Sequence, residues 1–310
     1  MTKCYTKVCK NCMSRNTKKD WSRRWKQSYK CKDCNYVWIS VSRKKDIDTR
    51  KLYHDYSVHK QTYSELWTMK WISKKTIQRK LDSFILPNKV IEGREEIVLL
   101  IDTTYFGNMW LMVFKEVRWK MILHFEIVNY ETNNWYKNWI RKLQEQWWII
   151  KAIVCDWRRW LLWWFADIPT QMCQFHQQQI VRRYITKKPV LEANKELKVI
   201  VDWLHRCDEW AFRIDLERWY KKHESFLKEQ WTKSNWKKYY IHKRTRCAYY
   251  SLKRNLEYLF IYERYWWELD IPNTTNGLEA VFSHLKYKVN LHRWLRQDRK
   301  IKLISYLLQH

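Results

Sequence analysis

Two aspartates each follow a short apolar run that has the length and composition of a buried strand. Residues 97–101 lead into Asp102, and residues 149–155 lead into Asp156. In an α/β sheet, the carboxyl ends of neighbouring strands present side chains to ligands, so two carboxylates there could share divalent cations. The position alone leaves this open, because an Asp after a strand is often only a turn residue or a helix cap.

A third carboxylate belongs to Glu279, on a helix that we expect to begin at Asn276. With the two aspartates it would give the set of ligands that two metal ions need. The same spacing also fits a capping box, in which Asn276 is the N-cap and Glu279 bonds back to the backbone. Both interpretations stay open at this point.

Four cysteines have the spacing of zinc ligands. Cys9 and Cys12 form one Cys-x2-Cys pair, and Cys31 and Cys34 form a second pair after 18 intervening residues. Two tight turns of this kind offer four thiolates to one tetrahedral Zn²⁺. The basic segment between the pairs is typical of a zinc ribbon that faces phosphate, although the zinc could also only hold a small fold together. Cys4 lies outside the pattern, and we interpret it as a spare thiol.

Residues 61–84 carry apolar side chains at the spacing of two short helices joined by a turn near Trp71 and Ile72. Ser73 would cap the second helix. The pattern predicts a helix-turn-helix, with an ordinary helical hairpin that has a basic face as the alternative. The second helix carries side chains of the types that contact phosphates and base edges in a major groove, namely Lys74, Lys75, Gln78 and Arg79.

The charge of the chain predicts a polyanionic partner. Lys and Arg number 61 against 32 Asp and Glu, a net charge of +29 on a chain that is 46% hydrophobic and is therefore expected to fold. Residues 1–60 hold 17 Lys and Arg against 5 Asp and Glu, which favours a nucleic-acid-binding module there. A basic surface kept for solubility is the alternative. No stretch is typical of a targeting or membrane-spanning segment, so we expect a cytoplasmic, nucleoid-associated protein without membrane contact.

The elements that must position the carboxylates alternate in type. From residue 95 the pattern predicts three strands, a helix, a strand, a second helix and a short strand, the order of a mixed sheet flanked by helices. Residues 177–268 have helical spacing without strand-like alternation, so we expect an all-helical insertion there. The expected strands cover residues 97–101, 109–117, 120–129, 149–155 and 170–175, and the expected helices cover residues 133–147 and 158–166.

Four segments resemble the sequence blocks of the bacterial Mutator-like insertion-sequence transposases, in the zinc-ribbon-containing subgroup of this DDE-type family. The likeness runs through nearly the whole chain, with the departure that Trp often stands where these blocks have Gly. The segments are LLIDTTYF at 99–106, AIVCDWRRWLLWWF at 152–165, PTQMCQFHQQQIVRRYITKKP at 169–189 and NTTNGLEAVFSHLKYKV at 273–289.

The resemblance assigns roles to individual residues. Asp102, which precedes a Thr, matches the first Asp of the family's triad, and Asp156 matches the second. Glu279 lies in a Thr-Asn-x-x-Glu block and matches the third. The pair Cys173-x2-His176 matches a Cys-x2-His element of the family. For these two residues we expect a supporting role beside the carboxylates, because a second zinc site would lack two of its ligands.

The resemblance also implies the fold and the activity. We expect an α/β, ribonuclease H-like mixed sheet at residues 95–310 with an all-helical insertion at 190–270, preceded by a zinc ribbon at 1–45 and a helix-turn-helix at 46–90. The implied activity is DNA cleavage and strand transfer with Mg²⁺ or Mn²⁺ held by the triad, while Zn²⁺ binds in the ribbon. The implied partners are terminal inverted repeats and target DNA, bound by a homodimer or a higher oligomer.

Two other functions compete with the transposase. In a transcription regulator, the zinc ribbon and the helix-turn-helix would bind DNA without catalysis, and the three carboxylates would have no purpose. A ribonuclease H-like nuclease or resolvase would cleave DNA without joining it. End-labelled DNA separates the three, since a regulator leaves it whole, a nuclease only cuts it and a transposase also yields joined products.

The amounts of Trp and Gly are abnormal. The chain has 23 Trp and 3 Gly, which together come close to the share of about 7% that Gly alone usually has. Trp71 stands where the expected turn needs a left-handed residue, and Trp147 lies in polar or turn-like surroundings. Trp157 and Trp160 flank a basic pair beside Asp156, where two indoles would crowd the expected metal site. The pattern predicts that many of the tryptophans are glycine in the natural protein, encoded by a reassigned stop codon. Trp219, on a helical face, is expected to be a true Trp; a chain rich in Trp for base stacking is the alternative.

Overall fold

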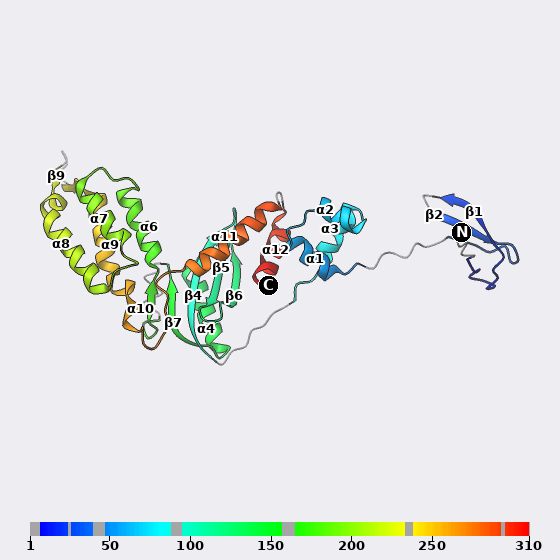
Figure 1. Cartoon of the computed structure of the whole chain (residues 1–310), viewed down its shortest axis with the longest axis horizontal. Coiled ribbons are helices and arrows are strands. Elements are labelled where there is room, and N and C mark those ends of the chain that lie inside the picture. Colours follow the sequence, from blue (N-terminus) through cyan, green and yellow to red (C-terminus); the bar gives the residue numbers. More distant parts are fainter. Residues whose placement is uncertain are drawn as a thin grey trace. The chain divides into compact units, whose positions relative to one another are not determined.

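The computed structural model describes residues 7–23, 26–39, 47–87, 95–156, 165–232, 238–292 and 295–309. The chain divides into two compact units, residues 1–52 and residues 53–310 (Figure 1). Most of the helix expected at 158–166 lies outside the described residues, as do Cys4, Trp157 and Trp160. Among the helices in these ranges, none combines the length and the apolar character needed to cross a membrane.

The first unit contains a three-stranded antiparallel sheet in the order β1-β2-β3. Among the described residues, the sheet has one small buried apolar cluster of Cys9, Cys31 and Trp38, with the ring of Tyr29 stacked on Trp38. A core this small does not hold three strands together by burial alone, so the cysteines must contribute to its stability. The strands are β1 (Thr17–Arg23), β2 (Lys26–Cys31) and β3 (Val37–Ile39).

Three helices follow the ribbon-like sheet. The expected pair of helices in residues 61–84 is confirmed, and so is the cap, because the Ser73 hydroxyl accepts a hydrogen bond from the Thr76 N–H at 3.2 Å. The turn between the two helices contains Trp71 with a left-handed backbone, φ 56°. The helices are α1 (Thr49–Ser57), α2 (Tyr63–Lys70) and α3 (Lys74–Ser83).

The second unit is built on a five-stranded mixed sheet in the order β6-β5-β4-β7-β8. β4 and β7 pair in parallel, as do β7 and β8, whereas β4, β5 and β6 form an antiparallel meander. The expected mixed sheet is therefore confirmed. Its strands are β4 (Glu96–Tyr105), β5 (Trp110–Glu116), β6 (Ile122–Val128), β7 (Ile149–Cys155) and β8 (Thr170–Met172).

The expectation that Asp102 ends its strand is wrong, because β4 continues for three more residues. The parallel ladder between β4 and β7 stops at Ile101 and Cys155, but the antiparallel ladder between β4 and β5 runs on to Tyr105. Asp102 therefore lies one residue beyond the last parallel pair, and Asp156 lies one residue beyond it on the other strand. The two aspartates therefore lie side by side, just beyond the end of the parallel ladder between β4 and β7.

Helices cover both faces of the sheet (Figure 1). On one face, α4 (Asn133–Glu145) packs its apolar side, including Tyr136, against alternate residues of β4. α11 (Asn276–Leu291) contacts β4 from the other face. Because successive side chains of a strand point to opposite faces, Asp102 points to the α11 side and Thr103 to the α4 side.

Between β8 and α11 the chain forms a mainly helical layer with one apolar core, which includes Phe212, Trp219 and Leu252. The expectation of an all-helical insertion is wrong in one place, because a short antiparallel hairpin of β9 (Gln230–Thr232) and β10 (Lys238–Tyr240) follows α8. Strands of three residues are too short to give a recognisable alternation. The helices are α6 (Gln174–Ile185), α7 (Glu192–Asp202), α8 (Glu209–Lys228), α9 (Lys243–Leu259) and α10 (Ile261–Arg264).

The last helix, α12 (Gln297–Gln309), forms from the basic C-terminal segment. It contacts α11 and the edge strand β6, and its apolar residues Leu303, Ile304 and Leu308 are buried. β8 is shorter than the expected strand at 170–175, because α6 already begins at Gln174.

Candidate active site

Three side chains from distant parts of the chain converge on the face of the sheet that α11 covers. Asp102 of β4, His176 of α6 and Glu279 of α11 each offer a ligand atom, and these atoms lie within 4.8 Å of one another. His176 Nε2 is 3.9 Å from Oε1 of Glu279. Two carboxylates and an imidazole are a donor set that could hold a divalent metal ion.

Asp156 lies beside this cluster, directly after β7. Together with Asp102 it lines a small hollow of about 140 Å³ at the edge of the sheet. Its charge acts on both neighbours, since it contributes to raising the pKa of Asp102 and that of His176. Of the triad expected from the sequence, the fold thus brings Asp102 and Glu279 into one cluster and places Asp156 next to Asp102.

Two contacts fix the start of α11, and with it Glu279. The sulfur of Cys173 accepts hydrogen bonds from the backbone N–H and the hydroxyl of Thr275, at 3.3 and 3.4 Å. Lys115 of β5 donates from Nζ to the carbonyl of Gly277 at 3.0 Å. The N-cap of α11 is Thr275, which makes no side-chain cap bond, so the capping box that competed with a metal-binding role for Glu279 is absent.

Cys173 also links α6 to the sheet, which places His176. The backbone N–H of Cys173 donates to the carbonyl of Cys155 at 2.9 Å, one residue before Asp156. The next residue, Gln174, donates its backbone N–H to Asn273 at 2.9 Å. His176 then falls in the first turn of α6 and faces the carboxylates. Cys173 therefore joins the sheet through its backbone and the start of α11 through its sulfur, whereas His176 reaches the cluster itself.

Burial and nearby charges set the ionisation of the cluster. Burial raises the pKa of Asp102 to about 6, against the opposing effects of His176 and of the Thr103 N–H. For His176, burial lowers the pKa, but the Cys173 side chain and the carboxylates of Asp156 and Asp102 outweigh it and raise the pKa to about 9. The imidazolium of His176 therefore offsets part of the negative charge of the carboxylates, an effect that a bound cation would also have.

Sequence reasoning missed a hydrogen-bonded chain on the α4 side of the hollow. The Tyr136 hydroxyl donates to the carboxylate of Glu131 and lies 2.6 Å from the hydroxyl of Thr103. Glu131 and Tyr136 line the hollow together with Asp102 and Asp156. Glu131 lies in the loop between β6 and α4, and nothing in its spacing relates it to the aspartates, so the sequence carried no signal for it.

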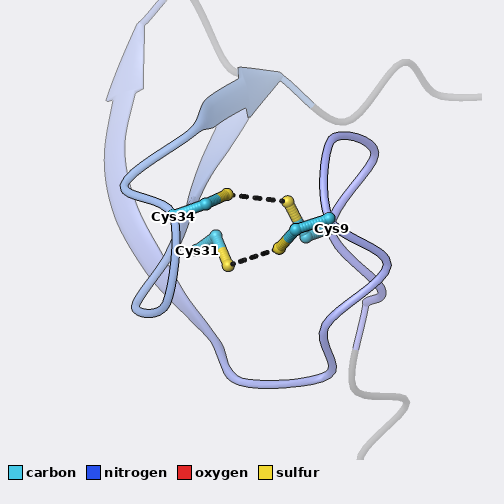
Figure 2. A group of neighbouring side chains, drawn as sticks. Cys9, Cys31 and Cys34 are labelled. Carbon is cyan, nitrogen blue, oxygen red and sulfur yellow. Dashed lines mark hydrogen bonds between the residues drawn. The ribbon is translucent and has the colours of Figure 1, made fainter.

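The four cysteines of the first unit form one cluster, as their spacing predicts. Their sulfur atoms all lie within 4.8 Å of one another. The shortest distances are 3.6 Å from Cys9 to Cys34 and 3.6 Å from Cys12 to Cys31. Figure 2 shows Cys31 and Cys34 facing Cys9 from a separate loop. Four sulfurs at about 2.3 Å from one tetrahedral Zn²⁺ would be roughly 3.8 Å apart, so the cluster could bind zinc.

Both Cys-x2-Cys turns end in the same backbone conformation. Met13 follows Cys12 with φ 60°, and Asn35 follows Cys34 with φ 57°. In the second turn, the backbone N–H of Tyr36 is the main cause that lowers the pKa of Cys34 to about 6. An amide donor that faces a sulfur favours the thiolate, which is the form that binds zinc.

The side chains expected to bind DNA on α3 do not all lie on one side. Lys74, Lys75 and Arg79 are exposed, and Lys74 lies over the ring of Trp67 at 5.6 Å. Gln78 is half-buried, with its side-chain amide against the guanidinium of Arg299 on α12. To contact a base, Gln78 would have to leave this partner.

Comparisons with protein-family models and with curated protein sequences give no match. Among solved structures, the chain is similar to the Drosophila P element transposase strand transfer complex. The TM-score is 0.43 and the sequence identity 12%, over 86% of this chain and 93% of that chain. A likeness this distant identifies neither the family nor the function of the chain.

Proposed function

We propose that the chain is a DNA transposase of the Mutator-like type, which cuts and joins DNA at the carboxylate cluster. The observation that carries the proposal is the convergence of Asp102, Glu279 and His176, with Asp156 beside them after β7. Acidic side chains gathered at one edge of a mixed sheet suit two-metal phosphoryl transfer. A DNA-binding regulator has no need of them.

The residues of the site divide the work of holding substrate and ions. Asp102 lies close to Glu279 and shares a hollow with Asp156, which supports a role as the ligand shared by both ions. Its buried position on the central strand keeps it rigid. His176 is placed to orient Glu279 or to contact a phosphate. A pair of Mg²⁺ or Mn²⁺ ions would activate a water or a DNA 3′-hydroxyl and stabilise the leaving oxygen.

Binding of DNA would be shared between the two units. In the first unit, the cysteine cluster would hold one Zn²⁺ and shape the basic loops around the small sheet. In the second, Lys75 and Arg79 lie one helical turn apart on the exposed side of α3, where both can reach one groove. The net charge of +29 attracts the DNA phosphates and so contributes affinity that does not depend on the DNA sequence. We expect a homodimer or a higher oligomer on paired DNA ends.

The deciding experiment is a cleavage and strand-transfer assay. The probe is the end-labelled DNA at each end of the element that encodes the chain, incubated with Mg²⁺ and with an unlabelled plasmid as target. A transposase yields labelled fragments and labelled joined products, and the Glu279→Gln variant yields neither. Cleavage without joining would make the protein a nuclease, and binding without cleavage would make it a regulator.

A further inference from the structure

One face of α12 holds the recognition helix candidate α3. Arg299 donates from Nε and Nη2 to the two carboxylate oxygens of Asp82, each at 2.8 Å, and its guanidinium also lies against Gln78. A two-pronged pair of this kind fixes orientation as well as distance. Gln78 and Asp82 are one helical turn apart, so Arg299 grips one edge of α3, next to the exposed edge that carries Lys75 and Arg79.

Lys302, one turn further along α12, holds the C-terminal end of the same helix. Its Nζ donates to the carbonyls of Leu81 and Asp82, at 2.8 and 2.9 Å. Carbonyls in the last turn of a helix have no partner within the helix, and a cation there also faces the negative end of the helix dipole. Lys302 thereby adds a second donor at the C-terminal end of α3, where the backbone N–H of Phe84 also donates to the Leu81 carbonyl at 3.4 Å.

Aromatic side chains continue the same face of α12. Tyr306 is 1% exposed, and its ring meets Tyr53 at 4.9 Å and Phe84 at 5.9 Å between centroids. Arg299, Lys302 and Tyr306 are spaced three and four residues apart, so they form one stripe along the helix. The whole stripe faces the α1 to α3 region.

Another side of α12 contacts the turn that follows the Asp102 strand. Lys300 donates from Nζ to the carbonyl of Phe106 at 3.1 Å, and the Asn108 amide donates to Gln297 at 3.3 Å. Phe106 is the first residue after β4, four residues beyond Asp102. The same helix therefore contacts α3 on one side and the turn after β4, the strand that carries Asp102, on another.

We propose that α12 holds α3 in a fixed position relative to the carboxylate cluster, and that Arg299 and Lys302 are positioning residues for the reaction. The position at which DNA is cut, counted from the sequence that α3 contacts, then depends on these two side chains. The part of the proposal that concerns the cutting position rests on the proposed transposase function. The part that concerns the hold on α3 does not.

The test compares Arg299→Met and Lys302→Met with the control Arg296→Met in the full chain. Arg296 lies just before α12 and pairs only with the exposed Asp298 among the contacts described, so its loss removes the same charge without touching α3. Amide hydrogen exchange of α3 should become about tenfold faster in the first two variants, and exchange of β4 and β7 should stay unchanged. The charge-reversed pair Asp82→Arg with Arg299→Asp should return α3 to slow exchange.

The second readout is the cutting position on the end-labelled element ends. The wild type and Arg296→Met should cut at one position, whereas Arg299→Met should cut over several neighbouring positions while its affinity for the DNA stays within about threefold. If exchange became faster by the same factor in α3 and in the sheet, or if the exchange rate of α3 did not change, the proposal that α12 holds α3 would be wrong. A single cutting position in Arg299→Met would overturn its role in the reaction. If the wild type does not cut at all, the proposed function fails, and hydrogen exchange still decides whether α12 holds α3.

Discussion

The carboxyl group of Asp102 is costly to keep charged where the fold puts it. Its side chain is buried on the central strand, and this burial raises its pKa from 3.8 to about 6. A folded-state pKa above the unfolded one means that stability falls as the pH rises from about 4 to about 6. Above pH 6, the charged carboxylate of Asp102 therefore lowers the stability of the chain without bound ions. Such a cost is common at functional sites.

This cost gives the first prediction. Asp102→Asn removes the buried charge, so without divalent ions the free energy of unfolding at pH 8 should rise, by up to about 3 kcal/mol. Under the proposed function, cleavage of the element ends in Mg²⁺ should fall by a factor of about 1,000 or more, because the carboxylate proposed to bind both ions is lost. Denaturant melts and the cleavage assay measure the two effects. Asp215→Asn, on the exposed surface of α8, is the control and should change neither; a variant that still cuts would remove Asp102 from the site.

Two tryptophans stand in backbone conformations that suit glycine. Trp71 caps α2 with φ 56° and is 83% exposed, and Trp147 follows α4 with φ 68° and is 74% exposed. They are two of the seven non-glycine residues with positive φ in the described part of the chain, although Trp is only 23 of 310 residues. A side chain in this region costs about 1–2 kcal/mol, and an exposed indole recovers none of it.

We therefore expect Trp71→Gly and Trp147→Gly each to raise the free energy of unfolding by about 1 kcal/mol, measured by denaturant melts. Trp219→Gly is the matched control, because Trp219 is 3% exposed and donates from Nε1 to the Ala193 carbonyl at 2.9 Å. It should lower the stability by about 3–5 kcal/mol. The codons give a second measurement: Trp71 and Trp147 should be encoded by TGA and Trp219 by TGG. Destabilisation by both glycine variants would refute the assignment.

At the scale of the element, local pattern predicted which segments are strands and helices but not where they end. β4 was expected to stop at Asp102, and it continues because β5 folds back to pair with it as far as Tyr105. The hairpin of β9 and β10 escaped prediction for the same reason, since strands of three residues exist only through their pairing. Ser73 was predicted correctly, because a helix cap depends on residues within one turn.

One strand carries a histidine that should make stability depend on pH. His124 on β6 stacks on Trp139 with ring centroids 3.3 Å apart, and its buried Nε2 has no hydrogen-bond partner among the described residues. Burial, with a smaller effect of Lys142, lowers its pKa from 6.5 to about 4. The unfolded chain then takes up a proton below pH 6.5 that the folded chain does not take up until about pH 4. Stability is therefore lost as the pH falls through this window.

The expected loss from His124 between pH 6.5 and pH 4 is about 3 kcal/mol. His124→Phe keeps a ring on Trp139 and cannot be protonated, so its stability should fall less over the same range. The difference between the two proteins, taken from denaturant melts at each pH, cancels the titration of all other groups. Parallel curves for the two proteins would show that His124 is not held neutral by the fold.

At the scale of the whole molecule, the contacts that build the site join residues far apart in the sequence. Asp102, His176 and Glu279 come from three elements, and the link from Cys173 to Thr275 crosses the entire insertion. No periodicity encodes such distances, so from residues alone the three carboxylates were only candidates, and a resemblance to known sequence blocks had to connect them. The contacts of Lys115, Glu131 and α12 around the site were not predicted. Each is made to a residue that is brought close only when the chain folds.

With Zn²⁺ proposed at the four cysteines, the division into two units predicts how the molecule would respond to the loss of this ion. In the part of the chain that the structure describes, the small sheet of the first unit has Cys9, Cys31 and Trp38 as its buried cluster, whereas the second unit has separate cores beneath α4 and within the insertion. Without the ion, the bonds from the four sulfurs to the metal are lost, and the four thiols are left close together. The small buried apolar cluster is then too small to stabilise three strands. The strands of the first unit should then unfold while the second unit keeps its structure.

Hydrogen exchange of the full chain, before and after treatment with a zinc chelator, tests this expectation. Amides of β1 to β3 should lose their protection, and those of β4 and β7 should keep it. Cys31→Ser should have the same effect without the chelator, and affinity for DNA should fall with it, since the basic loops lose their shape. Cys207→Ser, a half-buried thiol outside the cluster, is the control and should leave both unchanged. Slow exchange in β1 to β3 after complete removal of zinc, measured by metal analysis of the same sample, would show that the ribbon holds itself together and that the four cysteines have another purpose.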